Sequence, residues 1–271
     1  MPAPETEADV ALTGGFPTLP VPTAALVTGG ARRIGRALVL ALADAGHAVA
    51  IHHHRSSAAA DALAAEIIKA GGKAIAVAAD LADEAAVKRL LPEAMAALGP
   101  IGVLVNNASI FENDTVATAS RDGWDSHMAI NLRAPFVLTQ QFAALLPADA
   151  GGAVINLLDE RVWNLTPYFV SYTVTKDALW TLTRTMALAL APRIRVNGIG
   201  PGPTLPSPRQ SADQFLARCR SLPLRRGTSP GEIAAALRFI LAAPAMTGQM
   251  IALDGGEHLG WAQPGQAPLV E

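Results

Sequence analysis

The stretch ALVTGGARRIGRAL, residues 25–38, decides the fold because it places a strand, a turn and a helix in immediate succession. Its apolar start predicts a buried strand, and Gly29 and Gly30 permit the tight turn that follows. Gly35 lets the next segment pack as a helix close to that strand. The N-terminus of such a helix presents unpaired N–H groups that are suited to a pyrophosphate. The stretch therefore predicts a dinucleotide-binding turn, and an ordinary strand–helix turn is the alternative.

One position departs from the glycine pattern of such turns, because Arg33 stands where a middle glycine is usual. Arginine cannot copy the backbone freedom of glycine, but its guanidinium adds a cation beside phosphates. We expect Arg33 to lie next to the bound phosphates.

Short apolar runs alternate with longer Ala- and Leu-rich stretches through the rest of the chain. The apolar runs are 24–28, 48–52, 74–79, 103–106, 153–158, 194–199 and 250–253, and the stretches at helical spacing include 34–46, 58–71, 84–98, 124–146 and 172–191. Continuous apolar runs are typical of parallel strands that are covered on both faces. The sequence predicts an α/β fold, a single-domain doubly wound (Rossmann-type) sheet of about seven parallel strands with helices on both faces.

The amino-acid composition argues against several classes of protein. The 271 residues are 51% hydrophobic and 16% charged with a net charge of −2, so no basic field for nucleic acid is present. The single cysteine, Cys219, excludes an internal disulfide and a multi-cysteine metal site, and it suits a reducing, cytoplasmic setting. We expect no membrane span. Residues 1–22 hold five prolines and three acidic residues, which indicates a flexible leader ahead of one domain at 23–271.

Residues 200–231 interrupt the alternation of strands and helices and contain six prolines. A long irregular segment after a strand is typical of a lid or a substrate-binding loop, and a surface loop without a role is the alternative.

The cofactor preference follows from the end of the second strand, which reads IHHHRSS at residues 51–57. A site for NAD usually has an acidic residue there, which holds the ribose hydroxyls. This chain instead offers His54, Arg55 and Ser56, and a planar guanidinium can bind a 2′-phosphate through two hydrogen bonds. The sequence therefore predicts NADPH rather than NADH.

Two other residues near this strand have competing interpretations. His52 would share one face of the strand with His54, but no carboxylate or cysteine partner lies nearby, which argues against a metal. Asp80 follows the third strand and is a candidate acceptor for the adenine amine, with a helix cap as the equal alternative.

Polar side chains gather where the later strands end. The fourth strand ends in VNNAS, residues 105–109, and Asn131 follows within a helical stretch, where a solvent-facing position is an equal alternative. Tyr172 and Lys176 lie four residues apart, so a helix places them on one face. A phenol beside a cation suits proton transfer, because the cation stabilises the phenolate.

Together these residues resemble the short-chain dehydrogenase/reductase family over residues 24–260. The resemblance is carried by TGGARRIG (28–35), NNAS (106–109), Asn131, the pair Tyr172 and Lys176, RVNGIGPG (195–202) and TGQMIALDGG (247–256). It implies that Tyr172 donates the proton, that Lys176 lowers the pKa of Tyr172 and holds the nicotinamide ribose, and that Asn131 supports a water relay. It also implies a homotetramer.

The residue thirteen positions before Tyr172 departs from most members of that family, because Asp159 stands where a serine is usual. The pteridine reductase branch resembles this chain at that position, at Arg33, at the His-x-His-Arg-Ser pattern of residues 52–56, and at Phe111, which would stack on the pterin. Protonation of a ring nitrogen, rather than polarisation of a ketone, suits a carboxylic acid. Asp159 as a cap or an ion pair with Arg161, and Phe111 as a core residue, are the alternatives.

This resemblance implies a full set of site residues. Catalytic residues would be Asp159, Tyr172, Lys176 and Asn131; cofactor contacts would be Gly29, Arg32, Arg33, Ile34, Gly35, His54, Arg55, Ser56, Asp80, Leu81, Asn107, Ala108, Ser109, Tyr172, Lys176, Pro201, Gly202 and Thr204; substrate contacts would be Arg33, Ser109, Phe111, Asp159 and Tyr172.

The predicted function is NADPH-dependent reduction of a pteridine ring, a small-molecule substrate. A carbonyl reductase of the same family is the second hypothesis, and a dinucleotide-binding regulator without catalysis is the third. The Tyr172, Lys176 and Asn131 set argues against the regulator, whereas Asp159 and Arg33 argue against the carbonyl reductase.

Overall fold

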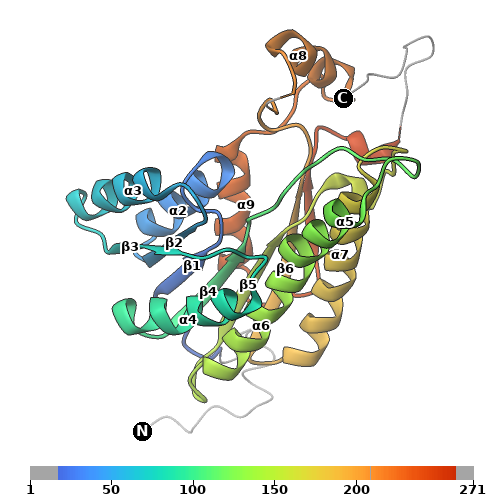
Figure 1. Cartoon of the computed structure of the whole chain (residues 1–271). Helices are drawn as coiled ribbons and strands as arrows, with labels where there is room; N and C mark the ends of the chain where they lie inside the picture. The colour runs from blue at the N-terminus through green and yellow to red at the C-terminus, as the bar shows by residue number, and fades with distance from the viewer. Residues whose placement is uncertain (1–17, 208, 261–271) are drawn as a thin grey trace, which may run out of the picture.

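The computed structural model describes residues 18–207 and 209–260, which form one parallel sheet covered by helices (Figure 1). The seven strands are β1 (Ala24–Val27), β2 (Ala48–His53), β3 (Ala74–Ala78), β4 (Ile101–Asn106), β5 (Gly152–Leu157), β6 (Ile194–Pro201) and β7 (Met250–Leu253). All neighbouring strands are parallel, in the order β3-β2-β1-β4-β5-β6-β7. The predicted Rossmann-type fold is confirmed.

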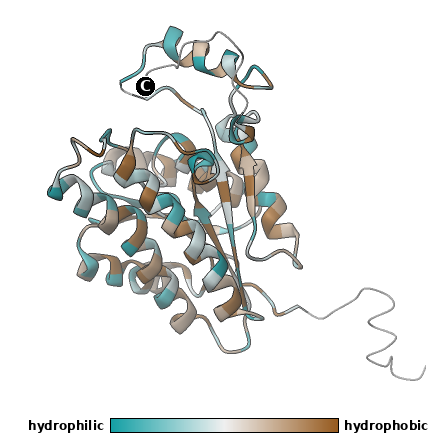
Figure 2. Cartoon of the chain, turned by 90° about the vertical axis from the view of Figure 1, so that its right-hand side faces the viewer, coloured by the Kyte–Doolittle hydropathy of each residue, from teal (hydrophilic) through white to brown (hydrophobic). Residues whose placement is uncertain are grey.

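Helices pack on both faces of the sheet. One face is covered by α2 (Arg33–Asp44), α3 (Ser57–Lys69) and α9 (Pro230–Ala242), and the other by α4 (Glu84–Leu98), α6 (Ala134–Leu145) and α7 (Val170–Leu190). Each layer of helices has its own apolar core against the strands. The five inner strands are buried along almost their whole length, and the edge strands β3 and β7 are partly buried. Hydrophilic residues lie on the helices and loops around the sheet (Figure 2).

The strand order reverses at β1, which pairs with β2 on one side and with β4 on the other. Ligands of open parallel sheets bind outside the carboxyl ends of the strands at such a reversal. Thr28, just past β1, fixes the two carboxyl ends together, because its hydroxyl accepts hydrogen bonds from the N–H groups of Asn107 (2.9 Å) and Ala108 (3.0 Å). The fold therefore positions a site between β1 and β4.

The expected helix over 124–146 is interrupted. It consists of α5 (Arg121–His127), a π-helical turn (Met128–Arg133) and α6. The wider turn contains Asn131, whose side chain bonds to both backbone groups of Ile110. A π-turn inside a helix often marks a functional position, and here it turns an amide side chain towards the sheet edge.

The prediction of an irregular segment over 200–231 was wrong for its middle part. Residues Ala212–Ser221 form helix α8, which lies above the carboxyl edge of the sheet in Figure 1. Ser211 and Gln214 form a capping box, because each side chain accepts a hydrogen bond from the backbone N–H of the other residue. This Ser-x-x-Gln signal was present in the sequence and predicts a helix start.

Of the predicted leader, residues 1–17 lie outside the described residues. Within 18–22, the Pro20 carbonyl accepts a hydrogen bond from the Gly151 N–H at 3.0 Å, which holds the chain against the edge of the fold opposite α8. Among the described residues, no helix has the length and apolar character needed to cross a membrane.

Candidate active site

The glycine turn after β1 is shaped by close approaches of backbone. Gly29 has φ of 61°, and a Cβ on Gly35 would overlap the Gly29 carbonyl oxygen, so only glycine fits there. The turn is also fixed by His52, whose Nδ1 accepts a hydrogen bond from the Gly29 N–H at 3.0 Å. Burial lowers the pKa of His52 to about 4, so the ring is neutral, and its Nε2 donates to the Ala79 carbonyl. His52 therefore supports the turn, a role that sequence analysis missed.

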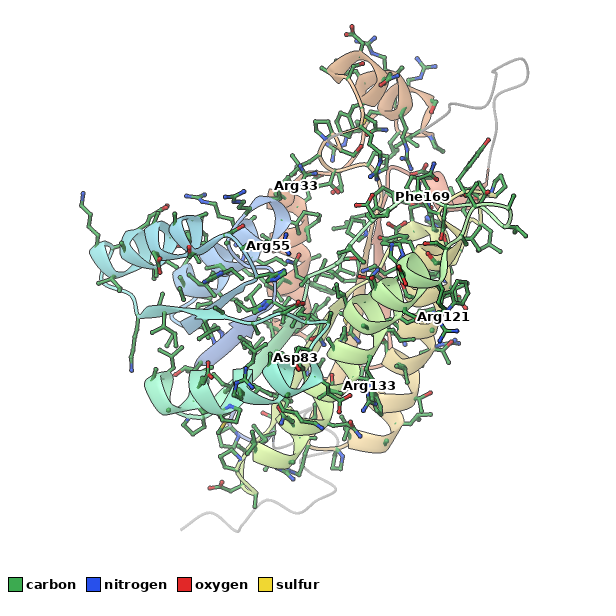
Figure 3. The ribbon with its side chains drawn as sticks, viewed as in Figure 1. Arg33, Arg55, Asp83, Arg121, Arg133 and Phe169 are labelled. Carbon is green, nitrogen blue, oxygen red and sulfur yellow. The ribbon has the colours of Figure 1, made fainter. Side chains whose placement is uncertain are left out.

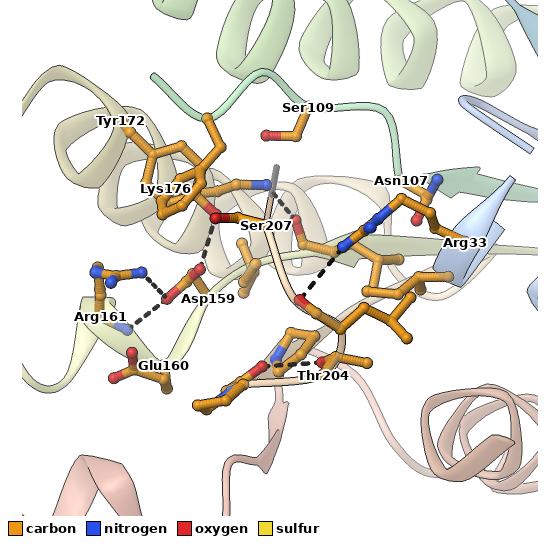
Figure 4. A pocket seen from close by; sticks show the side chains of 18 of the residues that line it. Arg33, Asn107, Ser109, Asp159, Glu160, Arg161, Tyr172, Lys176, Thr204 and Ser207 are labelled. Carbon is orange, nitrogen blue, oxygen red and sulfur yellow. Dashed lines mark hydrogen bonds and ion pairs between the residues drawn. The ribbon is translucent and has the colours of Figure 1, made fainter. Parts of the chain in front are cut away.

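Arg33 adopts a conformation that we did not expect. Its φ of 53° lies in the left-handed region, so arginine does copy the glycine conformation here, at a cost of about 1–2 kcal/mol. Its guanidinium donates hydrogen bonds to the carbonyls of Leu205 and Pro206, at 3.2–3.4 Å. Figure 4 shows this contact, which connects the glycine turn with the segment after β6.

Of the residues expected to contact the adenosine part of the cofactor, His54, Arg55 and Ser56 follow β2, and Asp80 follows β3. Figure 3 labels Arg55 and Arg33. His54 and Arg55 are exposed, and Ser56 is half-buried. Asp80 approaches His54 at 3.8 Å and accepts a hydrogen bond from the Ala82 N–H at 2.9 Å, so it acts as a turn residue in this structure. Among the described residues, no group of three or more His, Cys, Asp or Glu could hold a metal ion.

One pocket at the carboxyl edge brings together most of the predicted nicotinamide and substrate contacts. Its lining includes Arg33, Ile34, Asn107, Ser109, Phe111, Asp159, Tyr172, Lys176, Pro201, Gly202 and Thr204. The lining does not include Gly29, Arg32, Gly35, His54, Arg55, Ser56, Asp80, Leu81, Ala108 or Asn131.

Asp159 is the centre of the polar contacts in the pocket (Figure 4). Its Oδ2 accepts a hydrogen bond from the Tyr172 hydroxyl at 2.8 Å. Its Oδ1 accepts from the Arg161 N–H at 3.0 Å and lies 3.6 Å from Arg161 Nη1. The structural alternatives, a cap and an ion pair with Arg161, are therefore present together with the contact to Tyr172.

The electrostatics around Tyr172 differ from our expectation. Burial and the neighbouring Asp159 carboxylate raise the pKa of Tyr172 well above its ordinary value. Lys176 lies beside this pair: its Nζ donates to the Leu157 carbonyl at 2.7 Å and lies 5.6 Å from the Tyr172 ring centroid. Burial lowers the pKa of Lys176 to about 8, so a small change in its surroundings decides its charge near neutral pH. Asp159 and Tyr172 act as one hydrogen-bonded unit.

Asn131 is fully buried, which rules out the solvent-facing alternative. Its Oδ1 accepts from the Ile110 N–H at 2.9 Å, and its Nδ2 donates to the Ile110 carbonyl at 3.0 Å and to the Thr175 hydroxyl at 3.3 Å. The side chain thus joins the segment after β4 to α7 beside Tyr172.

Phe111 is half-buried and packs in an aromatic cluster. Its ring stacks on Phe169 with centroids 4.2 Å apart and meets the edge of Tyr172 at 4.7 Å. The guanidinium carbons of Arg161 and Arg209 lie 5.2–5.7 Å from both stacked ring centroids, which places each cation at the edge between the rings rather than over an outer face. Phe169 was missed by sequence analysis because its contact partner lies 58 residues away.

A buried acid lies next to Asp159. Glu160 is 2% exposed, and its Oε2 has no hydrogen-bond partner among the described residues. Arg218 of α8 lies 3.9 Å from Glu160 Oε1 and 3.0 Å from Glu257 Oε1. Burial, with the charges of Asp159 and Glu257, raises the pKa of Glu160 to about 9. Sequence analysis assigned neither Glu160 nor Arg218, because nothing in their spacing shows that they are buried.

The doubly wound sheet and a Tyr–Lys pair at its carboxyl edge define the class, an oxidoreductase built on a dinucleotide-binding scaffold. The chain belongs to the short chain dehydrogenase family, whose model matches residues 23–215.

Solved structures of related proteins agree with this assignment. The structure of FolM alternative dihydrofolate reductase 1 from Brucella canis, complexed with NADP, is 47% identical and has a TM-score of 0.88, covering 93% of this chain and 100% of that chain. The protein of the same name from Brucella suis, also with NADP, is 48% identical with a TM-score of 0.87, covering 90% and 98%.

A relative with another activity is similar as well. The 3-oxoacyl-[acyl-carrier-protein] reductase of Synechocystis sp. is 35% identical over 238 residues, which are 86% of this chain and 95% of the relative.

Proposed function

We propose that this protein is an NADPH-dependent reductase of a pteridine ring, with a dihydropteridine or dihydromonapterin-like substrate. The observation that carries the proposal is the 2.8 Å hydrogen bond from the Tyr172 hydroxyl to Asp159, which gives the proton donor a carboxylate partner. A carboxyl group suits protonation of a ring nitrogen. The similarity to two dihydrofolate reductases of this family supports the same substrate class.

The described residues fit a phosphorylated dinucleotide. Gly29 and Gly35 let the turn pack tightly against Asn107, Ala108 and its own backbone. The N–H groups at the start of α2 that follow this turn suit a pyrophosphate. Arg55 is exposed at the end of β2, where a guanidinium suits a 2′-phosphate, and IHHHRSS holds no acid that would repel it. When bound, NADPH supplies the hydride. Relatives solved with NADP support this cofactor.

The chain's own residues handle the proton. In the proposed mechanism the Tyr172 hydroxyl and the Asp159 carboxylate share one proton, which reaches the ring nitrogen from the hydroxyl directly or through the carboxyl group. Water replaces this proton after the product leaves. A raised pKa keeps the Tyr172 hydroxyl protonated until a nearby cation or the developing charge of the substrate assists its transfer. Lys176 supplies that cation when it is protonated, and buried Asn131 holds the adjacent backbone in place.

The pocket wall suits a flat heterocycle. Phe111 offers an aromatic ring next to Tyr172, and Ser109 and Arg33, which line the same pocket, offer hydrogen-bond donors. We propose these three residues as substrate contacts. A homotetramer, which the family resemblance implied, remains part of the proposal.

A carbonyl reductase is the second candidate, because a 3-oxoacyl reductase is 35% identical over most of the chain. NADPH oxidation by the wild type should be measured with a dihydropteridine and with a 3-oxoacyl thioester or simple ketone. We expect turnover of the dihydropteridine. Turnover confined to the carbonyl compounds would contradict the proposed function.

Substitution of Asp159 separates the two candidates further. Asp159→Asn keeps the shape but not the acid, so pteridine reduction should fall by about 10²-fold. Asp159→Ser restores a hydroxyl and should retain ketone activity while it loses pteridine activity. Asp61→Asn, an exposed change on α3, is the matched control and should behave as wild type. Wild-type pteridine rates in both Asp159 variants would show that the carboxylate is only a cap.

A further inference from the structure

Three buried or half-buried polar residues beside the pocket form a hydrogen-bonded chain that the proposed mechanism does not use. They are Asp114 in the segment after β4, His127 at the end of α5, and Ser171 in the first turn of α7. His127 is 1% exposed and Ser171 is fully buried. Burial of polar groups is costly unless they are paired, so their arrangement calls for a reason.

Asp114 provides the cap that α7 lacks. Phe169, which precedes α7, has φ of 56° and makes no side-chain cap to the helix. Asp114 Oδ1 accepts from the Ser171 N–H at 3.1 Å, and its backbone carbonyl accepts from the Phe169 N–H at 2.7 Å. A carboxylate at a helix N-terminus is also favoured by the helix dipole. A segment 57 residues earlier in the chain therefore fixes the start of the helix that carries Tyr172.

His127 is hydrogen bonded to Ser171, and the partners of its ring define its tautomer. The Glu112 N–H donates to His127 Nε2 at 3.3 Å, so the ring proton is on Nδ1. Nδ1 lies 2.8 Å from the Ser171 hydroxyl oxygen and 3.0 Å from the Gly123 carbonyl. The Ser171 hydroxyl donates to Asp114, so its oxygen accepts from His127. Since the serine proton points to the carboxylate and the hydroxyl is buried, this is not a hydrolytic triad.

The hydrogen bonds of Asp114, Ser171 and His127 connect two residues of the proposed substrate site. On one side, Glu112 is the neighbour of Phe111, whose ring meets Tyr172 edge-on at 4.7 Å. On the other side, Ser171 is the neighbour of Tyr172. A single hydroxyl group, on Ser171, thus joins the anchor of the Phe111 segment to the anchor of the Tyr172 helix.

We propose that Asp114, Ser171 and His127 are positioning residues that set the Phe111 ring relative to the Tyr172 hydroxyl and so determine how a flat substrate ring is held for protonation. This inference rests on the proposed pteridine reduction. A substrate ring must face Phe111 and present a nitrogen to Tyr172 at the same time, and a misplacement of about 1 Å costs about 10²-fold in rate.

The first test is Ser171→Ala, which removes the hydroxyl shared by Asp114 and His127. We expect the KM for a dihydropteridine to rise about tenfold and kcat/KM to fall by about 10- to 100-fold, with the Kd for NADPH within twofold of wild type. Asp114→Asn, which weakens the same contacts without leaving a gap, should change both constants in the same direction.

The matched control is Ser229→Ala. Ser229 caps α9, which packs against α2 on the opposite face of the sheet, and its hydroxyl accepts from the Glu232 N–H at 3.2 Å. Both serine variants should lower the melting temperature, but the control should keep wild-type KM and kcat. Equal kinetics in the Ser171 and Ser229 variants would assign Asp114, Ser171 and His127 a purely structural role and overturn the inference.

A double-mutant cycle tests whether the effect passes through Phe111. If it does, Ser171→Ala should change kcat/KM at least threefold less in a Phe111→Leu background than in the wild type. The same factor in both backgrounds would contradict the inference while the proposed function stands. A wild-type protein that reduces no dihydropteridine would instead contradict the proposed function itself, and this inference with it.

Discussion

At the scale of single residues, Asp159 combines roles that are usually separate. It caps a short 3-10 helix (Glu160–Val162), pairs with Arg161 and accepts the hydrogen bond of the Tyr172 hydroxyl. A carboxylate bonded to a phenol favours the protonated phenol, so Asp159 acts against early loss of the proton from Tyr172. The pair is therefore suited to release a proton only when charge develops on the substrate.

Tyr172→Phe tests this pair directly. The substitution keeps the ring and its contact with Phe111 but removes the hydroxyl, so turnover should fall by about 10²-fold or more while NADPH still binds. Stopped-flow turnover and a fluorescence titration of NADPH would measure the two effects separately. If turnover is retained, the proton comes from another group, and Asp159 is the next residue to substitute.

At the scale of elements, the strands were predictable because each begins as a continuous apolar run, and the inner strands are covered on both faces. The π-turn around Asn131 was not predictable, because apolar residues continue through it at helical spacing and only the contact with Ile110 shows the wider turn. The contact between Phe111 and Phe169 joins segments that are distant in the sequence, so only the three-dimensional structure shows it. Helix α8, by contrast, followed from its capping box, which we overlooked.

The residues between β2 and α3 are the basis for the prediction that NADPH is preferred over NADH. Arg55 is exposed there and Ser56 precedes the first residue of α3, so a 2′-phosphate would meet donors rather than an acid. We expect NADPH to be preferred over NADH by more than tenfold, or more than about 1.4 kcal/mol. Arg55→Asp should abolish or invert that preference in kcat/KM, whereas Arg121→Asp, an exposed change on α5, should not. Equal use of both cofactors by the wild type would contradict the assignment.

At the scale of the whole molecule, Glu160 links stability to pH. Its pKa rises from 4.5 to about 9 on folding, because burial and neighbouring acids disfavour its charge. Between those values the unfolded chain loses a proton that the folded chain keeps, so the contribution of Glu160 to the free energy of unfolding falls as pH rises.

Glu160→Gln removes this dependence. Glutamine does not ionise, so we expect the variant to lose less stability than wild type between pH 5 and pH 8, by about 1 kcal/mol per pH unit. Urea denaturation across that interval measures the slopes. Glu93→Gln, an exposed change on α4, should keep the wild-type slope. Parallel slopes for Glu160→Gln and wild type would show that Glu160 is already ionised in the folded protein.

The strand order also affects how the protein folds during its synthesis. Strand β1 lies inside the sheet, between β2 and β4, and its pairing with β4 joins residue 24 to residue 101 and residue 27 to residue 105. During synthesis one edge of β1 therefore stays open until β4 has left the ribosome, about four seconds or more later at 5–20 residues per second. Pairing over such separations is slow and leaves apolar strand edges exposed, so newly made chains should depend on chaperones more than finished ones.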